Sequence, residues 1–411
     1  MSGQTEEKTA LGDLRVLDLA DDKGAYCTKI LADLGADVVK VEPPGGEPTR
    51  DIPPFYCDIP HRERSLYFWQ YNSNKRSITL ALETTDGQDI FKRLIKKADI
   101  VVETFRPGYL DNLELGYETL SEINPALIMT SITAFGQTGP YKDYKASDIV
   151  GVSMGGMMNT CGYPDGPPVM PYGRQGYHVA ANHAAIATLI ALYYRDISGR
   201  GQHIDVSMQT AIAQSIEFGN EFYLYCQWVL KRQGSRHGSD GIGEPIGNVL
   251  PCKDGYICTF GHAGPLDWME ADGVVGTLKE DPRWLEDPLF RRIPENRRYL
   301  DERQQAWARL HTRQEITDGC QNLHISWAKC GTLEELFEDK HLLDRGFWID
   351  VEHPEVGATF KYPGAPYILQ KTPWKMVRRA PLIGEHNAEI YEKELGFSRE
   401  ELSILGAAGV V

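Results

Sequence analysis

The residues from Asp165 to Gln202 combine a turn, a helix start and groups that could do chemistry. Asp165–Pro168 (DGPP) predicts a turn, because glycine and proline supply its backbone angles. An alanine-rich helix follows and should end at Ser198–Gly201 (SGRG). Gly176–His178 lies at the expected start of that helix, where backbone N–H groups lack a partner within the helix. Such a position can bind an anion or present an acid or base, so it is the candidate site.

The side chain that decides the chemistry of this helix start is Tyr177. A phenol with a pKa near 10 is a poor nucleophile at neutral pH, so Tyr177 is interpreted as filling the site. His178 and His183 could transfer protons, although single histidines on a helix are more often structural. Asp165 belongs to the turn, and Asp196 lies ~28 Å along the helix at 1.5 Å per residue. No residue at this helix start is therefore predicted to be a nucleophile.

Composition limits the possible partners. The chain has 411 residues, 42% of them hydrophobic, and a formal net charge of −15. It can bury more core than one ordinary domain needs, and its charge argues against nucleic acid or an anionic membrane as partner. The first ten residues are polar and no apolar run reaches spanning length, so the protein is predicted to be cytoplasmic. The eight cysteines lack metal-ligand spacing, which predicts no metal site.

Alternating strands and helices predict an α/β fold. Strands are expected at 14–19, 38–42, 77–82, 100–103 and 127–133, and helices at 25–34, 87–97 and 208–231. This alternation favours a Rossmann-like parallel sheet with helices on both faces. The predicted domains are a large sheet domain at 11–218, a linker at 219–248, a smaller mixed α/β domain at 249–330, and a wrapping C-terminal segment at 331–411 that completes the large domain. Prolines at 363, 366, 373 and 381 favour an extended course for that segment.

Six ordered segments resemble the class III CoA-transferases, the CaiB/BaiF family. They are Tyr26–Arg50, Tyr71–Leu80, Glu103–Gly108, Ser131–Asp143, Gly199–Met208 and Ala380–Gly396. The resemblance implies an interlocked dimer and a catalytic aspartate after a glycine at a helix start. Tyr177 occupies that aspartate's position. The resemblance therefore implies a subunit with no catalytic residue of its own, paired in a heterodimer or heterotetramer with a paralogous chain that carries the aspartate.

The resemblance also implies which residues contact CoA. Phe105 stands where the family places an aromatic ring against adenine, and Lys145 where a lysine meets a phosphate. Thr104 replaces the usual asparagine of that loop. Lys75 and Arg76 are loop cations that either contact CoA or pin neighbouring carbonyl groups.

Other positions depart from the family pattern. Glu83 replaces a lysine, Asn112 replaces a basic residue of some members, and Ser147 replaces the histidine of the family's racemase branch. Asp22 falls near a glutamine that reaches the acyl group. No tightly bound cofactor is expected, and a CoA thioester is expected as substrate, either in this chain or only in the partner subunit.

The reaction that the resemblance implies is CoA transfer from succinyl-CoA to an aromatic dicarboxylic acid. Trp69, Tyr71, Tyr172 and Tyr177 could line a cavity for an aromatic group, and the glycine loop 241–244 is either a lid or a linker. Two alternatives stay open: a self-sufficient homodimeric transferase with an unrecognised nucleophile, and a non-enzymatic CoA-binding or scaffolding protein.

Overall fold

The computed structural model describes residues 9–216, 219–237, 244–245 and 247–411. Within these ranges the chain forms two compact units. Unit 1 holds residues 9–155, 172–215 and 340–411, and unit 2 holds 156–171 and 216–339. The boundaries expected from sequence differ because they assign 156–171 to the large domain, 219–248 to a linker and 331–339 to the C-terminal segment, whereas all three stretches belong to unit 2.

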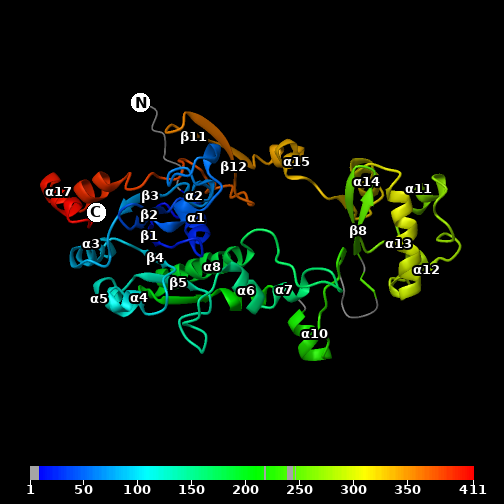
Figure 1. The fold of residues 1–411 in the computed structure, drawn as a ribbon, viewed down its shortest axis with the longest axis horizontal. Coiled ribbons are helices and arrows are strands. Elements are labelled where there is room, and N and C mark those ends of the chain that lie inside the picture. Colours follow the sequence, from blue (N-terminus) through cyan, green and yellow to red (C-terminus); the bar gives the residue numbers. More distant parts are fainter. Residues whose placement is uncertain (1–8, 217–218, 238–243, 246) are drawn as a thin grey trace. The chain divides into compact units, whose positions relative to one another are not determined.

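Unit 1 is built on a six-stranded parallel sheet, which confirms the predicted fold class (Figure 1). The strands are β1 (Arg15–Leu19), β2 (Asp37–Glu42), β3 (Arg76–Thr79), β4 (Ile100–Glu103), β5 (Ile128–Thr133) and β6 (His203–Ser207). Their order is β3-β2-β1-β4-β5-β6, and Leu17 of β1 lies between Val39 of β2 and Val101 of β4. The strand order reverses direction between β1 and β4. The loops after these two strands therefore meet at the switch point where such sheets bind ligands.

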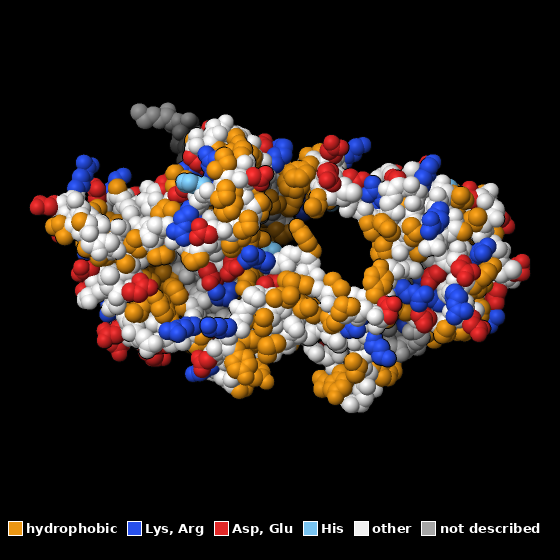
Figure 2. Space-filling view, viewed as in Figure 1, with side chains coloured by type: hydrophobic (Ala, Val, Ile, Leu, Met, Phe, Trp, Pro, Cys, Tyr) orange, Lys and Arg blue, Asp and Glu red, His pale blue; other side chains and the backbone are white. Residues whose placement is uncertain are grey.

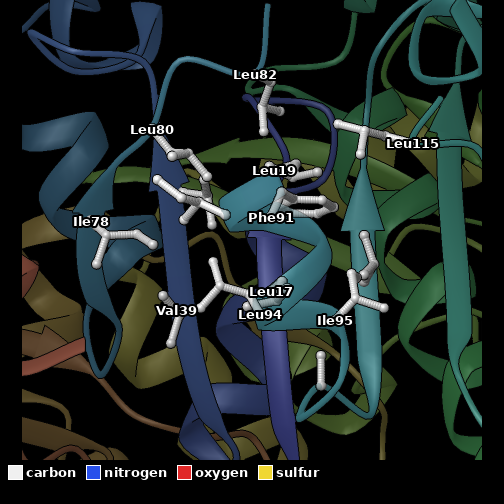
Figure 3. Close-up of a cluster of buried hydrophobic side chains, with 14 of the residues drawn as sticks. Leu17, Leu19, Val39, Ile78, Leu80, Leu82, Phe91, Leu94, Ile95 and Leu115 are labelled. Carbon is white, nitrogen blue, oxygen red and sulfur yellow. The ribbon is translucent and has the colours of Figure 1, made fainter. Parts of the chain in front are cut away.

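Apolar side chains from the strands and from α3 (Thr85–Ile95) form the main core of unit 1. Thr84 caps α3 by accepting a hydrogen bond from the Gly87 N–H. Figure 3 shows Phe91 and Leu94 of this helix over Leu17 of the sheet. The other helices of unit 1 are α1 (Ala25–Asp33), α2 (Leu66–Asn72), α4 (Tyr109–Asn112), α5 (Tyr117–Ile123), α6 (Asp148–Met154), α8 (Gln175–Ser198), α9 (Met208–Gln214) and α16 (Lys340–Asp344).

The last residues of the chain complete the same unit. They form the hairpin β11 (Trp348–His353) and β12 (Ala358–Pro363), a π-helix (Ala388–Glu394) and α17 (Arg399–Ala407). Glu394 forms ion pairs with Arg15 and Arg76, and the Ala81 N–H donates to the Val410 carbonyl at 2.8 Å. Segments more than 300 residues apart in sequence are thus joined side by side.

Unit 2 has its own antiparallel sheet and core. The sheet order is β10-β9-β8-β7, with β7 (Arg236–His237), β8 (Gly247–Cys252), β9 (Gly255–Phe260) and β10 (Ala328–Lys329). The helices are α7 (Met157–Thr160), α10 (Gly219–Cys226), α11 (Leu266–Ala271), α12 (Arg283–Glu286), α13 (Pro294–Ala308), α14 (Arg313–Asn322) and α15 (Leu333–Glu338). Trp307 and Trp327 are fully buried in its core.

The helix expected over 208–231 is wrong in its extent. Helix α9 ends at Gln214, α10 spans Gly219–Cys226, and the chain leaves helical geometry at Gln227, where φ is 59°. Among the described residues, the helices are too short or too polar to cross a bilayer. Charged side chains of both signs are interspersed over the face seen in Figure 2.

Candidate functional site

The helix predicted at the candidate site is α8, whose first turn contains Tyr177. The small side chains on the buried face of α8 allow this helix to lie close to α1 and β5. These small residues are Gly176, Ala180, Ala181, Ala184, Ala185 and Ala191. Thr188 shares a 2.8 Å hydrogen bond with Thr130 of β5. The helix ends at Gly199, whose φ of 71° is the left-handed geometry expected of a glycine cap. The close packing of α8 therefore fixes the position of its first turn.

A carboxylate from another helix holds the start of α8. Asp148, the first residue of α6, accepts the Tyr177 N–H at 2.8 Å through Oδ1, and the nearby Gly176 N–H also lowers its pKa. Its Oδ2 is buried without a hydrogen-bond partner among the described residues. Burial raises the pKa of Asp148, against the lowering effect of those two N–H groups. The free N–H groups expected at this helix start are thus partly occupied by a side chain of the protein itself.

The Tyr177 side chain is packed into the protein, with 7% of its surface exposed. Burial raises the pKa of its phenol far above the ordinary value, and the charges of Asp22, Asp21 and Asp148 raise it further. The hydroxyl therefore stays protonated at neutral pH. A buried, protonated phenol is a poor nucleophile.

An ion pair and several aromatic rings surround the first turn of α8. Arg174 forms an ion pair with Asp22, and its guanidinium lies 4.5 Å from the centre of the Tyr67 ring. Tyr71 packs on Tyr67 with ring centres 4.7 Å apart, and its hydroxyl lies 2.7 Å from His178 Nε2. Burial lowers the pKa of His178, so this imidazole is neutral at pH 7. The surroundings suit an aromatic group, and the cation Arg174 among them is already paired with Asp22.

The sequence did not single out Arg174, Tyr67 or Asp148. Tyr67 and Arg174 stand more than 100 positions apart, and only the fold joins them. The one local signal was Arg174 itself, a cation two residues before Gly176 at a helix start, where positive charge opposes the helix dipole. Its pairing with Asp22 accounts for that placement.

Two of the four aromatic residues expected around an acyl cavity are placed elsewhere, which corrects that expectation. Trp69 is buried in a separate cluster, 4.2 Å from the His353 ring. Tyr172 is 94% exposed. Helix α2 presents Trp69 and Tyr71 on different faces, because residues two apart on a helix do not face the same way. Tyr71 and Tyr177 are the two that belong to the surroundings of the α8 start.

The residues expected to contact CoA fall into two groups. Thr104 and Phe105 follow β4 at the switch point, where the Thr104 hydroxyl donates to Asp21 at 2.8 Å and tethers the loop after β1. Phe105 packs on Tyr109, with ring centres 4.6 Å apart. The Tyr109 hydroxyl in turn donates to Glu83.

The three cations of the prediction differ in exposure. Lys145 is exposed. Lys75 is fully buried, and its ammonium group contacts Asp18 at 2.8 Å along with three other oxygen atoms. Arg76 pairs with Asp37 at 2.5 Å. A phosphate could reach Lys75 or Arg76 only by displacing these partners.

Two further expectations concern a lid and a metal. Gly241, Ile242 and Gly243 lie outside the described residues, so of the glycine loop only Glu244 is described, paired with Arg236 at 2.5 Å. Within the described ranges, no group of three or more His, Cys, Asp or Glu side chains is arranged to hold a metal ion.

Comparison with known proteins gives a consistent match over nearly the whole chain. Residues 11–387 match the model of CoA-transferase family III. The chain is 34% identical over 408 residues to the BbsE subunit of succinyl-CoA:(R)-benzylsuccinate CoA-transferase from Thauera aromatica, covering 97% of each chain. It is 34% identical to formyl-CoA:oxalate CoA-transferase from Streptomyces avermitilis, covering 98% of this chain and 99% of the relative. A CaiB/BaiF family protein from Brucella suis has a similar structure, with a TM-score of 0.81, 30% identity, and coverage of 94% of this chain and 99% of that one.

Proposed function

Because the chain belongs to CoA-transferase family III, we propose that it is the catalytically degenerate subunit of a heteromeric CoA-transferase. The observation that carries this proposal is Tyr177, a buried and protonated phenol on the first turn of α8. A transferase of this kind needs an ionised carboxylate there, because the acyl group must pass through a mixed anhydride before CoA is exchanged. An aryl ester of tyrosine does not provide that intermediate.

The partner in this proposal is a paralogous chain that carries the aspartate at the start of its own α8-like helix. It performs the acyl transfer, and this chain completes the assembly as a heterodimer or heterotetramer. The name of the relative from Thauera aromatica supports such an arrangement, since it describes that protein as one subunit of a transferase.

For the substrates we propose succinyl-CoA as donor and an aromatic dicarboxylic acid such as (R)-benzylsuccinate as acceptor, with a role in anaerobic toluene degradation in the cytoplasm. The support is the reaction in the name of the same relative. Tyr67, Tyr71 and Tyr177 around the α8 start are compatible with an aromatic acid.

For CoA contacts we propose Phe105 against the adenine, Thr104 as the hydrogen-bonding support of that loop, and Lys145 as the phosphate contact. The exposure of Lys145 and the position of the loop at the sheet switch point support these roles. In this proposal Lys75 and Arg76 stabilise the fold and do not contact CoA, because their charges are already paired within the protein.

The test uses the purified chain, the purified paralogue and the co-expressed complex, each assayed for CoA transfer from succinyl-CoA to (R)-benzylsuccinate. We expect turnover by the complex and none by this chain alone. Removing the carboxylate of the paralogue's aspartate should abolish turnover of the complex, whereas Tyr177→Phe in this chain should leave it nearly unchanged. Turnover by the isolated chain at the rate of the complex would refute the degenerate-subunit proposal.

A second candidate function is a self-sufficient transferase, and Asp148 is the observation that favours it. Its Oδ2 is buried, lacks a hydrogen-bond partner among the described residues and lies at the start of α8. Its raised pKa and burial make it a weak nucleophile in this conformation. If the isolated chain is active, Asp148→Asn should abolish that activity. Activity that survives this change would remove Asp148 as the nucleophile.

A further inference from the structure

Three hydrogen-bonding side chains form a row across β4, β5 and β6. Glu103 ends β4, Ser131 is its neighbour in the register of β5, and the Ser131 hydroxyl lies near enough to the Glu103 carboxyl to lower its pKa. On its other side the Ser131 oxygen lies 2.9 Å from His203 Nε2, at the start of β6. Glu103 Oε2 also accepts the Phe105 N–H at 2.7 Å. The row therefore ends on the backbone of the loop that carries Phe105.

The row leads from the protein interior to solvent. Glu103 and Ser131 are 4% and 1% exposed, whereas His203 is an exposed residue. A cavity of about 30 Å³ touches all three and is also lined by Arg106 and Asp111. A space of this size holds one water molecule, so a proton can reach the buried end from outside.

Glu103 is the group in the row that titrates near neutral pH. Burial raises its pKa to about 7, and Asp21 raises it as well. Ser131, the Phe105 N–H and Lys23 lower the pKa but do not cancel the effect of burial. The carboxyl thus changes charge close to neutral pH, in contact with the loop backbone.

His203 is suited to exchange the proton. Its ring stacks on Tyr117, with centres 5.6 Å apart. Burial of this face lowers the pKa of His203, while the charges of Asp205, Asp111 and Glu118 raise it. The imidazole is therefore neutral at pH 7 and is free to carry its proton on either nitrogen.

We propose that Glu103, Ser131 and His203 form a proton relay that controls how firmly the Glu103–Gly108 loop is held at the end of β4. Glu103 is the positioning residue, because it acts on the loop through the Phe105 N–H. This inference rests on the proposed function in one respect. CoA is a ligand of this loop only if Phe105 contacts the adenine, as proposed above.

The relay has two complete arrangements that differ by one proton. With Glu103 ionised, His203 Nε2–H donates to Ser131 Oγ, and the Ser131 hydroxyl donates to the carboxylate. On protonation, His203 takes a proton from solvent at Nδ1 and passes its Nε2 proton to Ser131, which passes its own to Glu103. Glu103 then donates to Ser131, and Ser131 donates to His203 Nε2. All three side chains stay hydrogen-bonded in both arrangements.

Linkage gives the direction of the effect. The carboxyl binds its proton more tightly in the closed loop than in an opened loop, where water restores the ordinary pKa of 4.5. Opening is therefore suppressed at low pH, increases as the pH rises from 4.5 to about 7, and is constant above that. A pKa that differs by one between the two states corresponds to about a tenfold change in the opening constant.

The experiment measures amide hydrogen exchange of Phe105 in the full chain between pH 5 and pH 8.5, corrected for the chemical exchange rate. We expect the opening constant to rise at least ~10-fold between pH 5 and pH 7.5 and then to level off. In Glu103→Gln it should be independent of pH. A flat profile in the unmodified chain would overturn the proposal.

Two variants test the relay itself by shifting the midpoint in opposite directions. Ser131→Ala removes a donor to the carboxylate, so the midpoint should move to higher pH. His203→Leu leaves the Ser131 proton without an acceptor when Glu103 is protonated, so the midpoint should move to lower pH. His203→Gln can donate and accept and should keep the midpoint, as should the control His183→Leu on α8. If Ser131→Ala fails to fold, the comparison of His203→Leu with His203→Gln still tests the relay. Equal pH midpoints of loop opening in these two variants would overturn it.

A separate titration with CoA distinguishes this inference from the proposed function. We expect CoA to bind at least ~3-fold more tightly at pH 6 than at pH 8 in the unmodified chain, and equally at both in Glu103→Gln. A pH-dependent loop without CoA binding at either pH would count against the proposed CoA contact and leave the relay standing. Equal CoA binding at both pH values, with a flat exchange profile, would overturn the relay alone.

Discussion

The backbone N–H of Tyr177 donates a 2.8 Å hydrogen bond to Asp148 Oδ1. The start of a 24-residue helix, which is the place where a catalytic carboxylate would be stabilised, therefore already holds a carboxylate from α6. A second carboxylate would have to share this short stretch of backbone with Asp148. An aspartate placed at position 177 would therefore meet the carboxylate of Asp148.

We predict that Tyr177→Asp will not produce a fully active enzyme from this chain. The charges of Asp22, Asp21 and Asp148 that raise the pKa of Tyr177 would also raise that of the new carboxyl, and a pKa higher by one makes ionisation ~1.4 kcal/mol less favourable. Glu83 and Asn112 would still weaken CoA binding. Intact mass after incubation with succinyl-CoA should show less than a stoichiometric covalent adduct. Tyr177→Asn is the control, and full adduct formation by the aspartate variant would contradict the prediction.

We predict that Asp148→Ala will lower the free energy of unfolding by about 1–2 kcal/mol, because it removes the side chain that caps α8. Asp148→Asn keeps an acceptor oxygen and should cost less. The control is Asp143→Ala, at an exposed residue of the preceding loop. Urea unfolding of the three variants checks the order, and equal stability of Asp148→Ala and the control would show that the cap contributes nothing.

We predict opposite behaviour for two lysines that the sequence placed together at CoA. Lys75→Ala should lower the free energy of unfolding by about 3–5 kcal/mol, because it leaves buried Asp18 without its nearest cation. Lys145→Ala removes an exposed side chain, so stability should change by less than ~0.5 kcal/mol. CoA affinity, measured by calorimetry on folded protein, should fall for Lys145→Ala. A stable Lys75→Ala variant that had lost CoA binding would reverse this assignment.

We predict that the stability of this chain depends on its partner. Leu333 and Phe337 in unit 2 are 71% and 49% exposed, and Ile368 and Val377 in unit 1 are 63% and 72% exposed. Apolar groups exposed to this degree are typical of surfaces that a partner covers, and an interlocked dimer would bury well beyond ~2,000 Å². The complex with the aspartate-bearing paralogue should survive dilution to nanomolar concentration. A stable monomer at micromolar concentration in analytical ultracentrifugation would contradict the interlocked dimer.

The sheet could be predicted where its strands are rich in Val, Ile and Leu. The strand expected at 100–103 is β4, and those expected at 14–19 and 38–42 differ from β1 and β2 by one residue. The edge strand β6 was missed because only Val206 is buried in it, so its residues show no apolar run. Edge strands are paired on one side only, and their composition is close to that of a loop.

The position of the helix start could be predicted from the sequence, but the residues that surround it in the fold could not. A glycine followed by an aromatic residue at the start of a small-residue helix is a local pattern, and local patterns can be read directly. The pairing of Arg174 with Asp22, and the capping by Asp148, depend on how β1, α6 and α8 approach one another. Such contacts are set by packing across the sheet, which periodicity in one segment does not encode.

The joining of residues 388–411 to the sheet has a consequence for synthesis on the ribosome. Strands β1 to β6 have all been synthesised by residue 207. The ion pairs of Arg15 and Arg76 with Glu394, and the hydrogen bond from Ala81 to the Val410 carbonyl, form only after the last residues are made. At ~5–20 residues per second, roughly 10–40 s pass between the emergence of β6 and of these partners. Through that interval the edge strand β3 and the apolar face that covers Tyr391 are open to other nascent chains. A chain built in this way keeps part of its sheet uncovered until its synthesis is nearly complete.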